Sequence, residues 1–194
     1  MSGLCTIYWK ELADYLGSKK FIILFLIVGL TSGSIIYILS QTASSDVSLF
    51  TGEYLFLKLF TFSGGTLPSF IFFVSFFGPL IGIIFGFDAI NSERSSGTMS
   101  TVLSQPIYRD SLINGKFLAG LTTIAIMLIS IITIVFGLEL VVFGIIPSAA
   151  ELVRIGLFFI LSIVYIGFWL GLGILFSIIF KQTATSALVS IMVW

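Results

Sequence analysis

The sequence predicts an all-α, polytopic membrane protein with four complete transmembrane helices, the start of a fifth, an amphipathic N-terminal helix and one long cytoplasmic loop. Composition supports this prediction, because hydrophobic residues make up 58% of the 194, charged residues only 9%, and the mean hydropathy is +1.19. A soluble domain carries roughly 25% charged residues, so this chain lacks the polar surface that a globular protein exposes to water. Its apolar runs are long and unbroken, which favours helices over the alternating strands of a membrane barrel.

Four apolar segments have the length of about 20 residues that a membrane crossing needs. They are 21–39, 67–87, 117–138 and 155–180. A fifth apolar stretch, 184–194, is only about half a span long when the sequence stops. We therefore expect a fragment or a truncated gene product, whose native chain completes this span and returns through a sixth. The alternative is that 184–194 folds back along the cytoplasmic interface.

Basic residues in the short loops predict the orientation, because they concentrate on the cytoplasmic side. Seven lie before the first span, between the second and third, or after the fourth: Lys10, Lys19, Lys20, Arg94, Arg109, Lys116 and Lys181. The alternate loops hold only Lys58 and Arg154. We therefore expect a multi-pass protein of the cell membrane whose N-terminus, 88–116 loop and 181–183 turn are cytoplasmic.

The segment before the first span, 1–20, has the pattern of a helix lying in the membrane interface. Its apolar face is formed at helical spacing by Ile7, Tyr8, Leu12, Tyr15 and Leu16. The charged residues Lys10, Glu11 and Asp14 fall largely on another face, as in an interfacial amphipathic helix. A simple extension that leads into the first span is the alternative.

Composition also excludes several partners and sites. Net charge is zero and there is no basic tract, so the expected partners include the lipid bilayer but not nucleic acid. There is no histidine and a single cysteine, Cys5, which excludes a disulfide framework and a metal site built on imidazole or several thiolates. We interpret Cys5 as an ordinary small residue, with acylation as the alternative.

Enzyme classes find little support in the sequence. No phosphate-binding loop occurs, so we predict that this polypeptide does not hydrolyse nucleotide by itself, is not an enzyme and has no cofactor. No aspartate lies inside a span, which argues against an intramembrane protease and weakens an ion-driven carrier. Glu139 directly follows the third span, and we interpret it as an interfacial residue at the outer end of that span.

The loop 88–116 is where we expect a functional site. Gly97 ends one short helical piece, and Thr98 can cap the next. Pro106 then ends this second helix. Within it, residues at i, i+3 and i+4 form one apolar face: Met99, Val102 and Leu103.

A small amphipathic helix between two membrane helices is suited to passing force to a docked partner. Its apolar face can fill a groove on the partner, while Glu93, Arg94 and Arg109 form ion pairs at the rim or within the scaffold. The alternative is a helix that packs against the underside of the protein itself.

At this loop the sequence resembles the permease subunits of ABC type-2 transporters. The matching residues are Asn91-Ser-Glu93-Arg94-Ser-Ser-Gly97-Thr98-Met99, then Leu103-Ser-Gln-Pro106-Ile-Tyr-Arg109, then Gly115-Lys116 before the third span. The amphipathic entry, the first span and the turn after the fourth also fit, so the resemblance covers 1–194 as a single permease domain. It is closest to the permeases related to copper-processing and gliding-type systems.

The resemblance implies six spans per permease, a second permease copy as a homo- or heterodimer, and separate ATP-binding-cassette ATPase subunits. It implies an exporter driven by ATP that those subunits hydrolyse. The residues that would couple to the ATPase are Glu93, Arg94, Gly97, Thr98, Met99, Val102, Leu103, Pro106 and Arg109. The missing sixth span departs from the family pattern. A non-transporting membrane scaffold or sensor that recruits a cytoplasmic partner is the second hypothesis.

Overall fold

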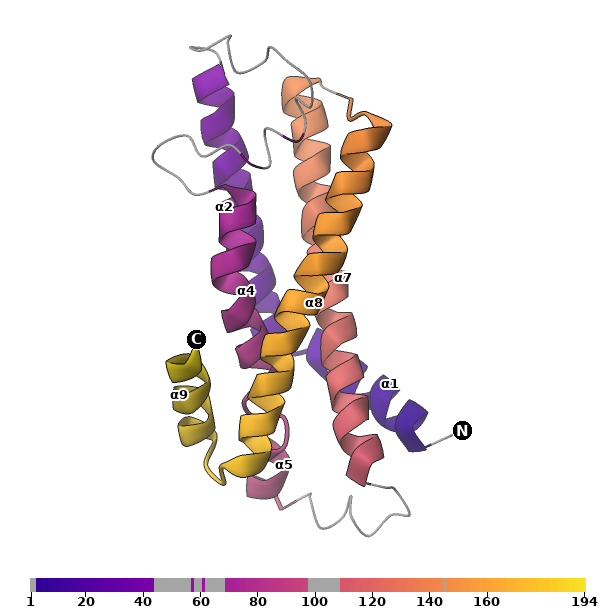
Figure 1. Cartoon of the computed structure of the whole chain (residues 1–194), viewed down its shortest axis with the longest axis vertical. Helices are drawn as coiled ribbons and strands as arrows, with labels where there is room; N and C mark the ends of the chain where they lie inside the picture. Colours follow the sequence, from indigo (N-terminus) through magenta and orange to yellow (C-terminus); the bar gives the residue numbers. More distant parts are fainter. Residues whose placement is uncertain (1–2, 44–56, 58–60, 62–68, 98–108, 145) are drawn as a thin grey trace. The chain divides into compact units, whose positions relative to one another are not determined.

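The computed structural model describes residues 3–43, 57, 61, 69–97, 109–144 and 146–194. Regular structure in these ranges is entirely α-helical, which confirms the predicted fold class. Figure 1 shows the helices along the chain: α1 (Gly3–Leu16), α2 (Lys19–Ala43), α4 (Phe70–Gly86), α5 (Asn91–Ser95), α7 (Arg109–Phe143), α8 (Ala149–Ile179) and α9 (Thr183–Val193).

Among the described residues, three stretches are long and apolar enough to cross a membrane: Ile71–Ser95, Asp110–Phe143 and Ala149–Ile179. The count rises to four if Gly3–Leu16 and Lys19–Ser34, which are bent by 55° relative to each other, form one broken span. An α-helix rises 1.5 Å per residue, so the 34 residues of the second stretch and the 31 residues of the third exceed the roughly 30 Å of a hydrocarbon core, whereas the first stretch combines α4 with a turn and α5. These lengths fit a multi-pass helical membrane protein.

Each expected span falls on a helix, although the boundaries differ. The largest difference is in α7, which begins at Arg109 and continues through Phe143, well beyond the expected 117–138. The helix continues past Glu139 to Phe143, and Glu139 itself is buried at 2% exposure. The interpretation of Glu139 as an interfacial residue stays a prediction. The helix predicted between Thr98 and Pro106 lies outside the described residues.

The chain divides into two compact units, and α2, α4, α7 and α8 each contribute residues to both. Unit 1 comprises Met1–Ile23, Gly78–Ile126 and Ile163–Trp194, and unit 2 comprises Leu24–Phe77 and Met127–Ser162. The most deeply buried apolar side chains of unit 1 are Ile83, Phe85, Ala119, Ile124, Ile166 and Leu170.

Unit 2 has an apolar core of its own, and its α8 begins with a capping box. The buried side chains include Val28, Phe73, Met127, Ile131 and Val135. Glu151 accepts hydrogen bonds from the backbone N–H of Ser148 at 2.8 Å and from its hydroxyl at 2.9 Å. The other carboxylate oxygen of Glu151 accepts the N–H of Leu57 at 3.1 Å. A Ser-x-x-Glu capping box satisfies backbone donors that a helix start leaves open.

Within unit 1, α4 and α8 approach each other at glycines. A Cβ added to Gly82 would lie 2.6 Å from the carbonyl oxygen of Ile166, and one added to Gly86 would lie 2.6 Å from that of Leu170. A Cβ added to Gly173 would lie 3.0 Å from the Cα of Gly86. Residues four apart share a helix face, and small residues at this spacing let two membrane helices pack backbone to backbone. We call Gly82, Gly86 and Gly173 the glycine contact.

Candidate functional site

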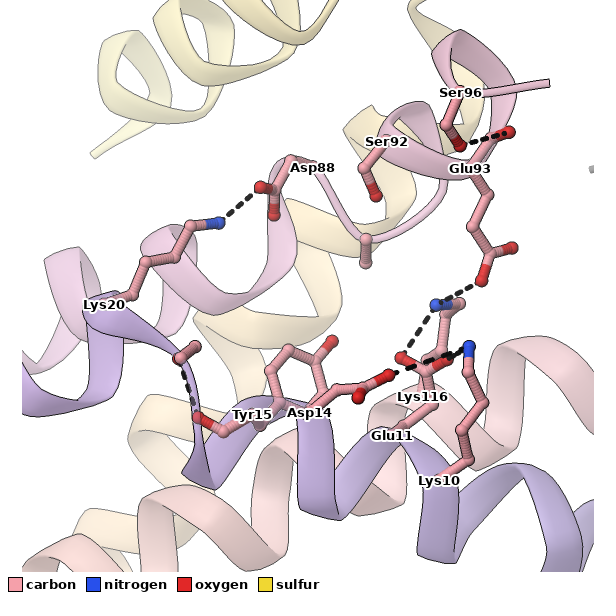
Figure 2. Close-up of a pocket in the computed structure, with 12 residues that line it drawn as sticks. Lys10, Glu11, Asp14, Tyr15, Lys20, Asp88, Ser92, Glu93, Ser96 and Lys116 are labelled. Atoms are coloured by element: carbon pink, nitrogen blue, oxygen red, sulfur yellow. Dashed lines mark hydrogen bonds and ion pairs between the residues drawn. The ribbon is translucent and has the colours of Figure 1, made fainter. Parts of the chain in front are cut away.

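A buried lysine joins three helices of unit 1 through two carboxylates. The ammonium of Lys116 on α7 lies 2.8 Å from a carboxylate oxygen of Glu11 on α1 and 2.9 Å from one of Glu93 on α5. The side chain of Lys116 is 4% exposed, and those of Glu11 and Glu93 are 8% and 12% exposed. Figure 2 shows the ammonium between the two carboxylates. We call these three residues the ionic junction.

Glycine allows α1 to pack closely on α7 beside this lysine. A Cβ on Gly115 would lie 2.8 Å from the Cγ2 of Ile7, so any larger residue would push α1 away. The hydroxyl of Tyr8 donates to the hydroxyl of Thr122 at 3.1 Å, about two helical turns beyond Gly115 along α7. The adjacent Gly115 and Lys116 therefore act together, because the glycine admits the helix and the lysine binds its carboxylate.

The inward position of Glu11 differs from the sequence prediction. The amphipathic pattern places Glu11 with Lys10 and Asp14 on a polar face, and those two neighbours are exposed at 61% and 64%. Glu11, however, is buried with Ile7 and Leu12 on the face that packs inside unit 1. A carboxylate is tolerated on a buried face when a paired cation satisfies it, and Lys116 supplies that cation.

The turn 87–90, which leads into the α5 helix that carries Glu93, is held to α8 and α9 by hydrogen bonds. The hydroxyl oxygen of Ser177 accepts the N–H groups of Ile90 at 3.0 Å and Asn91 at 3.1 Å. The hydroxyl of Ser186 on α9 donates to the carbonyl oxygen of Phe87 at 2.9 Å. Buried backbone donors that find partners make the turn a defined structure, so that α5 projects Glu93 toward Lys116.

A second ion pair closes the other side of a charged cleft. Lys20 at the start of α2 pairs with Asp88 after α4, and its ammonium also lies 4.8 Å from the ring centroid of Phe87. The cleft between the two sets of charges has a volume of about 410 Å³ (Figure 2). Its lining residues are Lys10, Glu11, Asp14, Tyr15, Ser18, Lys20, Asp88, Ala89, Ser92, Glu93, Ser96 and Lys116.

Tyr15 and Lys10 line this cleft from α1. Burial, reinforced by the negative charges of Glu11 and Asp88, raises the pKa of the Tyr15 hydroxyl. That hydroxyl stays protonated and lies 3.5 Å from the carbonyl oxygen of Phe85, which accepts its hydrogen bond. At the rim, Lys10 lies 3.1 Å from Glu11. The cleft therefore combines lysines, carboxylates and hydroxyls that stabilise one another.

No group of three or more His, Cys, Asp or Glu that could hold a metal ion occurs among the residues the structure describes.

The predicted site residues differ in where the structure places them. Glu93 belongs to the ionic junction, whereas its neighbour Arg94 is exposed. Gly97 has a φ of +73° just beyond α5, so glycine supplies the left-handed conformation that ends the helix, as predicted. Arg109 begins α7. The remaining predicted residues lie outside the described ranges: Thr98, Met99, Val102, Leu103 and Pro106.

Sequence reasoning missed the pairing of Glu11 with Lys116 and the anchor at Ser177. One signal was available, because a lysine that directly precedes an apolar span in a chain with 9% charged residues needs a partner when it is buried. Nothing in the spacing, however, identifies that partner as Glu11.

Fold and junction together define a helical membrane protein in which one buried ion pair joins the N-terminal helix α1 to α7, and a second joins α5 to the same lysine of α7. The chain belongs to the ABC-2 family of transporter proteins, because the family model described as ABC-2 family transporter protein matches residues 5–194. This match confirms the resemblance to ABC type-2 permeases.

A relative from Pseudomonas aeruginosa, described as probable ABC transporter permease protein NosY, is 28% identical over 186 residues. The alignment covers 95% of this chain and 58% of that relative. The chain thus spans less than two thirds of the length of the curated relative that it matches.

Proposed function

We propose that this chain is the membrane-spanning permease subunit of an ATP-binding-cassette exporter, in which a separate ATPase subunit hydrolyses the ATP. Family membership supports the class of protein. One structural observation supports the mechanism: the ion pair of 2.9 Å between Glu93 and Lys116 joins the residues on either side of 98–108. Force applied to 98–108 reaches both α5 and α7, because their ends are held together at this pair.

In this proposal the 88–116 loop makes two kinds of contact, one with the ATPase subunit and one with the membrane helices of its own chain. Met99, Val102 and Leu103 form the apolar face that enters the ATPase subunit, and exposed Arg94 together with Arg109 forms ion pairs at its rim. Glu93 faces inward and keeps the loop attached to the membrane helices. A working transporter contains two permease copies and two ATPase subunits, so each permease presents one such loop.

Charge introduced on the apolar face tests this proposal. In the full-length gene product, Val102→Asp or Leu103→Asp should reduce co-purification of the ATP-binding subunit encoded nearest to this gene by tenfold or more. Burying an aliphatic anchor contributes about 1.5–3 kcal/mol, and an unpaired buried charge costs more. Ser100→Asp is the matched control, because position 100 lies off the predicted apolar face, and it should change co-purification less than threefold.

Normal co-purification of the ATPase with both apolar-face variants would remove 98–108 from the interface. If the wild-type protein brings down a cytoplasmic protein without nucleotide-binding activity, the scaffold or sensor function replaces the transporter.

We also propose that the N-terminus and the 88–116 loop face the cytoplasm of a cell-membrane protein. The concentration of basic residues supports the cytoplasmic side for both segments, and the ionic junction supports a common location, since α1, α5 and α7 meet at Lys116. Single cysteines at Ser2, Ser45 and Ser96, with Cys5 replaced by serine, test this topology. An impermeant thiol reagent applied to intact cells should label position 45 only; labelling at position 96 would reverse the topology.

A further inference from the structure

We propose that Lys116 is a positioning residue that ties α1 to the 88–116 loop at α5, so that α1 and α5 move as one element. The role of this tie in coupling rests on the proposed function, whereas the tie itself is a property of this chain. It assigns the N-terminal helix a part in transmission, beyond anchoring the protein at the membrane interface.

The burial of Lys116 favours a permanent tie over a passing surface contact. A lysine at 4% exposure that loses a carboxylate would keep a buried charge with one partner fewer, so separation of the helices is opposed. Exposed ion pairs impose no such restriction, because water replaces either partner. Lys10 illustrates the exposed kind at the rim, since its side chain is 61% exposed.

The two carboxylates hold different elements through one cation. Glu11 lies on α1, and Glu93 lies on α5, which immediately precedes 98–108. The pairs are of nearly equal length, at 2.8 Å and 2.9 Å, so the ammonium bridges the two elements and does not belong to one of them. Displacement of α5 therefore pulls on Lys116, and Lys116 pulls on Glu11.

Close packing on the same helix makes the tie stiff. The Ile7 side chain sits over Gly115, where an added Cβ would lie 2.8 Å away, and Tyr8 bonds Thr122 at 3.1 Å. These contacts keep α1 against α7 along more than one turn. The ion pairs fix its register, and the packing limits rotation.

Hydrogen–deuterium exchange of the purified full-length protein in lipid nanodiscs tests the tie without any partner. Glu11→Gln should accelerate amide exchange in 3–16 at least tenfold while leaving 91–97 within twofold of wild type. Glu93→Gln should do the reverse, and Lys116→Met should accelerate both segments. Lys116→Arg should stay within threefold of wild type, because guanidinium also bridges two carboxylates.

Matched controls keep the charge change but leave the junction intact. Asp14→Asn removes a carboxylate that is 64% exposed on the same helix, and Lys19→Met removes an exposed lysine; both should leave exchange within twofold. Should Lys116→Met fail to fold, the two Glu→Gln variants decide the question. Unchanged exchange in 3–16 of Glu11→Gln would overturn the tie.

Coupling is tested separately with the ATPase complex. Glu11→Gln should leave co-purification of the ATPase within twofold and lower ATP turnover by the complex at least fivefold. Loosened α1 with unchanged ATP turnover would overturn the role of α1 in coupling. If the wild-type protein binds no ATPase, the proposed function fails, and the exchange experiment still decides whether Lys116 ties α1 to the loop.

Discussion

The glycine contact and the ionic junction hold together the same unit with opposite chemistry. At the glycine contact α4 and α8 meet backbone to backbone, with Gly82 and Gly86 against the main chain of α8. At the ionic junction α1, α5 and α7 meet through long side chains with full charges. An atom added at the glycine contact should destabilise the packing of α4 on α8, whereas a charge removed from the ionic junction should destabilise the attachment of α1 and α5 to α7.

The difference follows from what surrounds each pair of helices. Apolar helices in lipid gain nothing from the hydrophobic effect on association, so close packing between small residues supplies the attraction. α1 carries charges and amphipathic side chains, and its attachment uses a buried lysine with two acceptors. We learn that helix packing positions the spans, while charge specifies how the N-terminal helix attaches to them.

Removing the cation at the junction should have the largest effect. Lys116→Met leaves Glu11 and Glu93 buried without their shared cation, and breaking such a pair costs about 3–5 kcal/mol. Denaturant titration in detergent micelles measures this loss as a lowered free energy of unfolding. A loss below about 1 kcal/mol, the value for an exposed pair, would show that the junction is hydrated.

Adding one methyl group at the glycine contact should have a smaller but clear effect. Gly86→Ala places a Cβ where the nearest atoms are backbone at 2.6 Å and 2.9 Å, and overpacking typically costs about 1–3 kcal/mol. Gly33→Ala is the control, since no atom of the residues that the structure describes lies within 4 Å of an added Cβ there. The same denaturant titration should show a loss for Gly86→Ala only. Equal stability of both variants would mean that α4 and α8 are not packed this closely.

The smallest effect is expected where a polar side chain is buried without a hydrogen-bond partner. Both amide atoms of the Asn91 side chain are buried without a hydrogen-bond partner in the described part of the chain. Asn91→Leu should therefore change the free energy of unfolding by less than about 1 kcal/mol, because no bond is lost.

Ser177→Ala is the comparison for Asn91→Leu, because it leaves two backbone donors unsatisfied. A buried donor without an acceptor costs about 1–3 kcal/mol, so this variant should be measurably less stable. A larger loss for Asn91→Leu than for Ser177→Ala would assign the Asn91 amide a partner of its own.

Composition predicts the fold class in two steps. A chain with so few charges is expected to lie in lipid, and long apolar segments in lipid satisfy their backbone hydrogen bonds by forming α-helices. Helix ends are predicted less well. α8 begins at Ala149, six residues before the expected span, since the capping box at Ser148 and Glu151 starts the helix outside the apolar run. α7 continues past Glu139 to Phe143, because a single acid does not interrupt a helix whose apolar run resumes in 140–143.

The site is predicted in part. Glu93 was expected to form a scaffold or rim ion pair, and its partner proved to be Lys116. Glu11 was assigned to the polar face because periodicity describes one helix at a time and says nothing of a cation on another. The spacing of Gly82 and Gly86 is visible in the sequence. Their packing partners could not be predicted, because these partners belong to α8, a distant segment of the chain. The apolar face of Met99, Val102 and Leu103 stays a prediction.

Tyr8 and its partner Thr122 are 114 positions apart, and this separation dictates an order of events during biosynthesis. At roughly 5–20 residues per second, Tyr8 is synthesised roughly 6–23 seconds before its partner on α7. Until then Glu11 remains hydrated at the membrane surface. Lys116 reaches it only if the intervening segments have inserted with the right number of crossings, since one crossing too few would leave the lysine on the opposite side. Closure of the junction thus selects correctly threaded chains from misinserted ones.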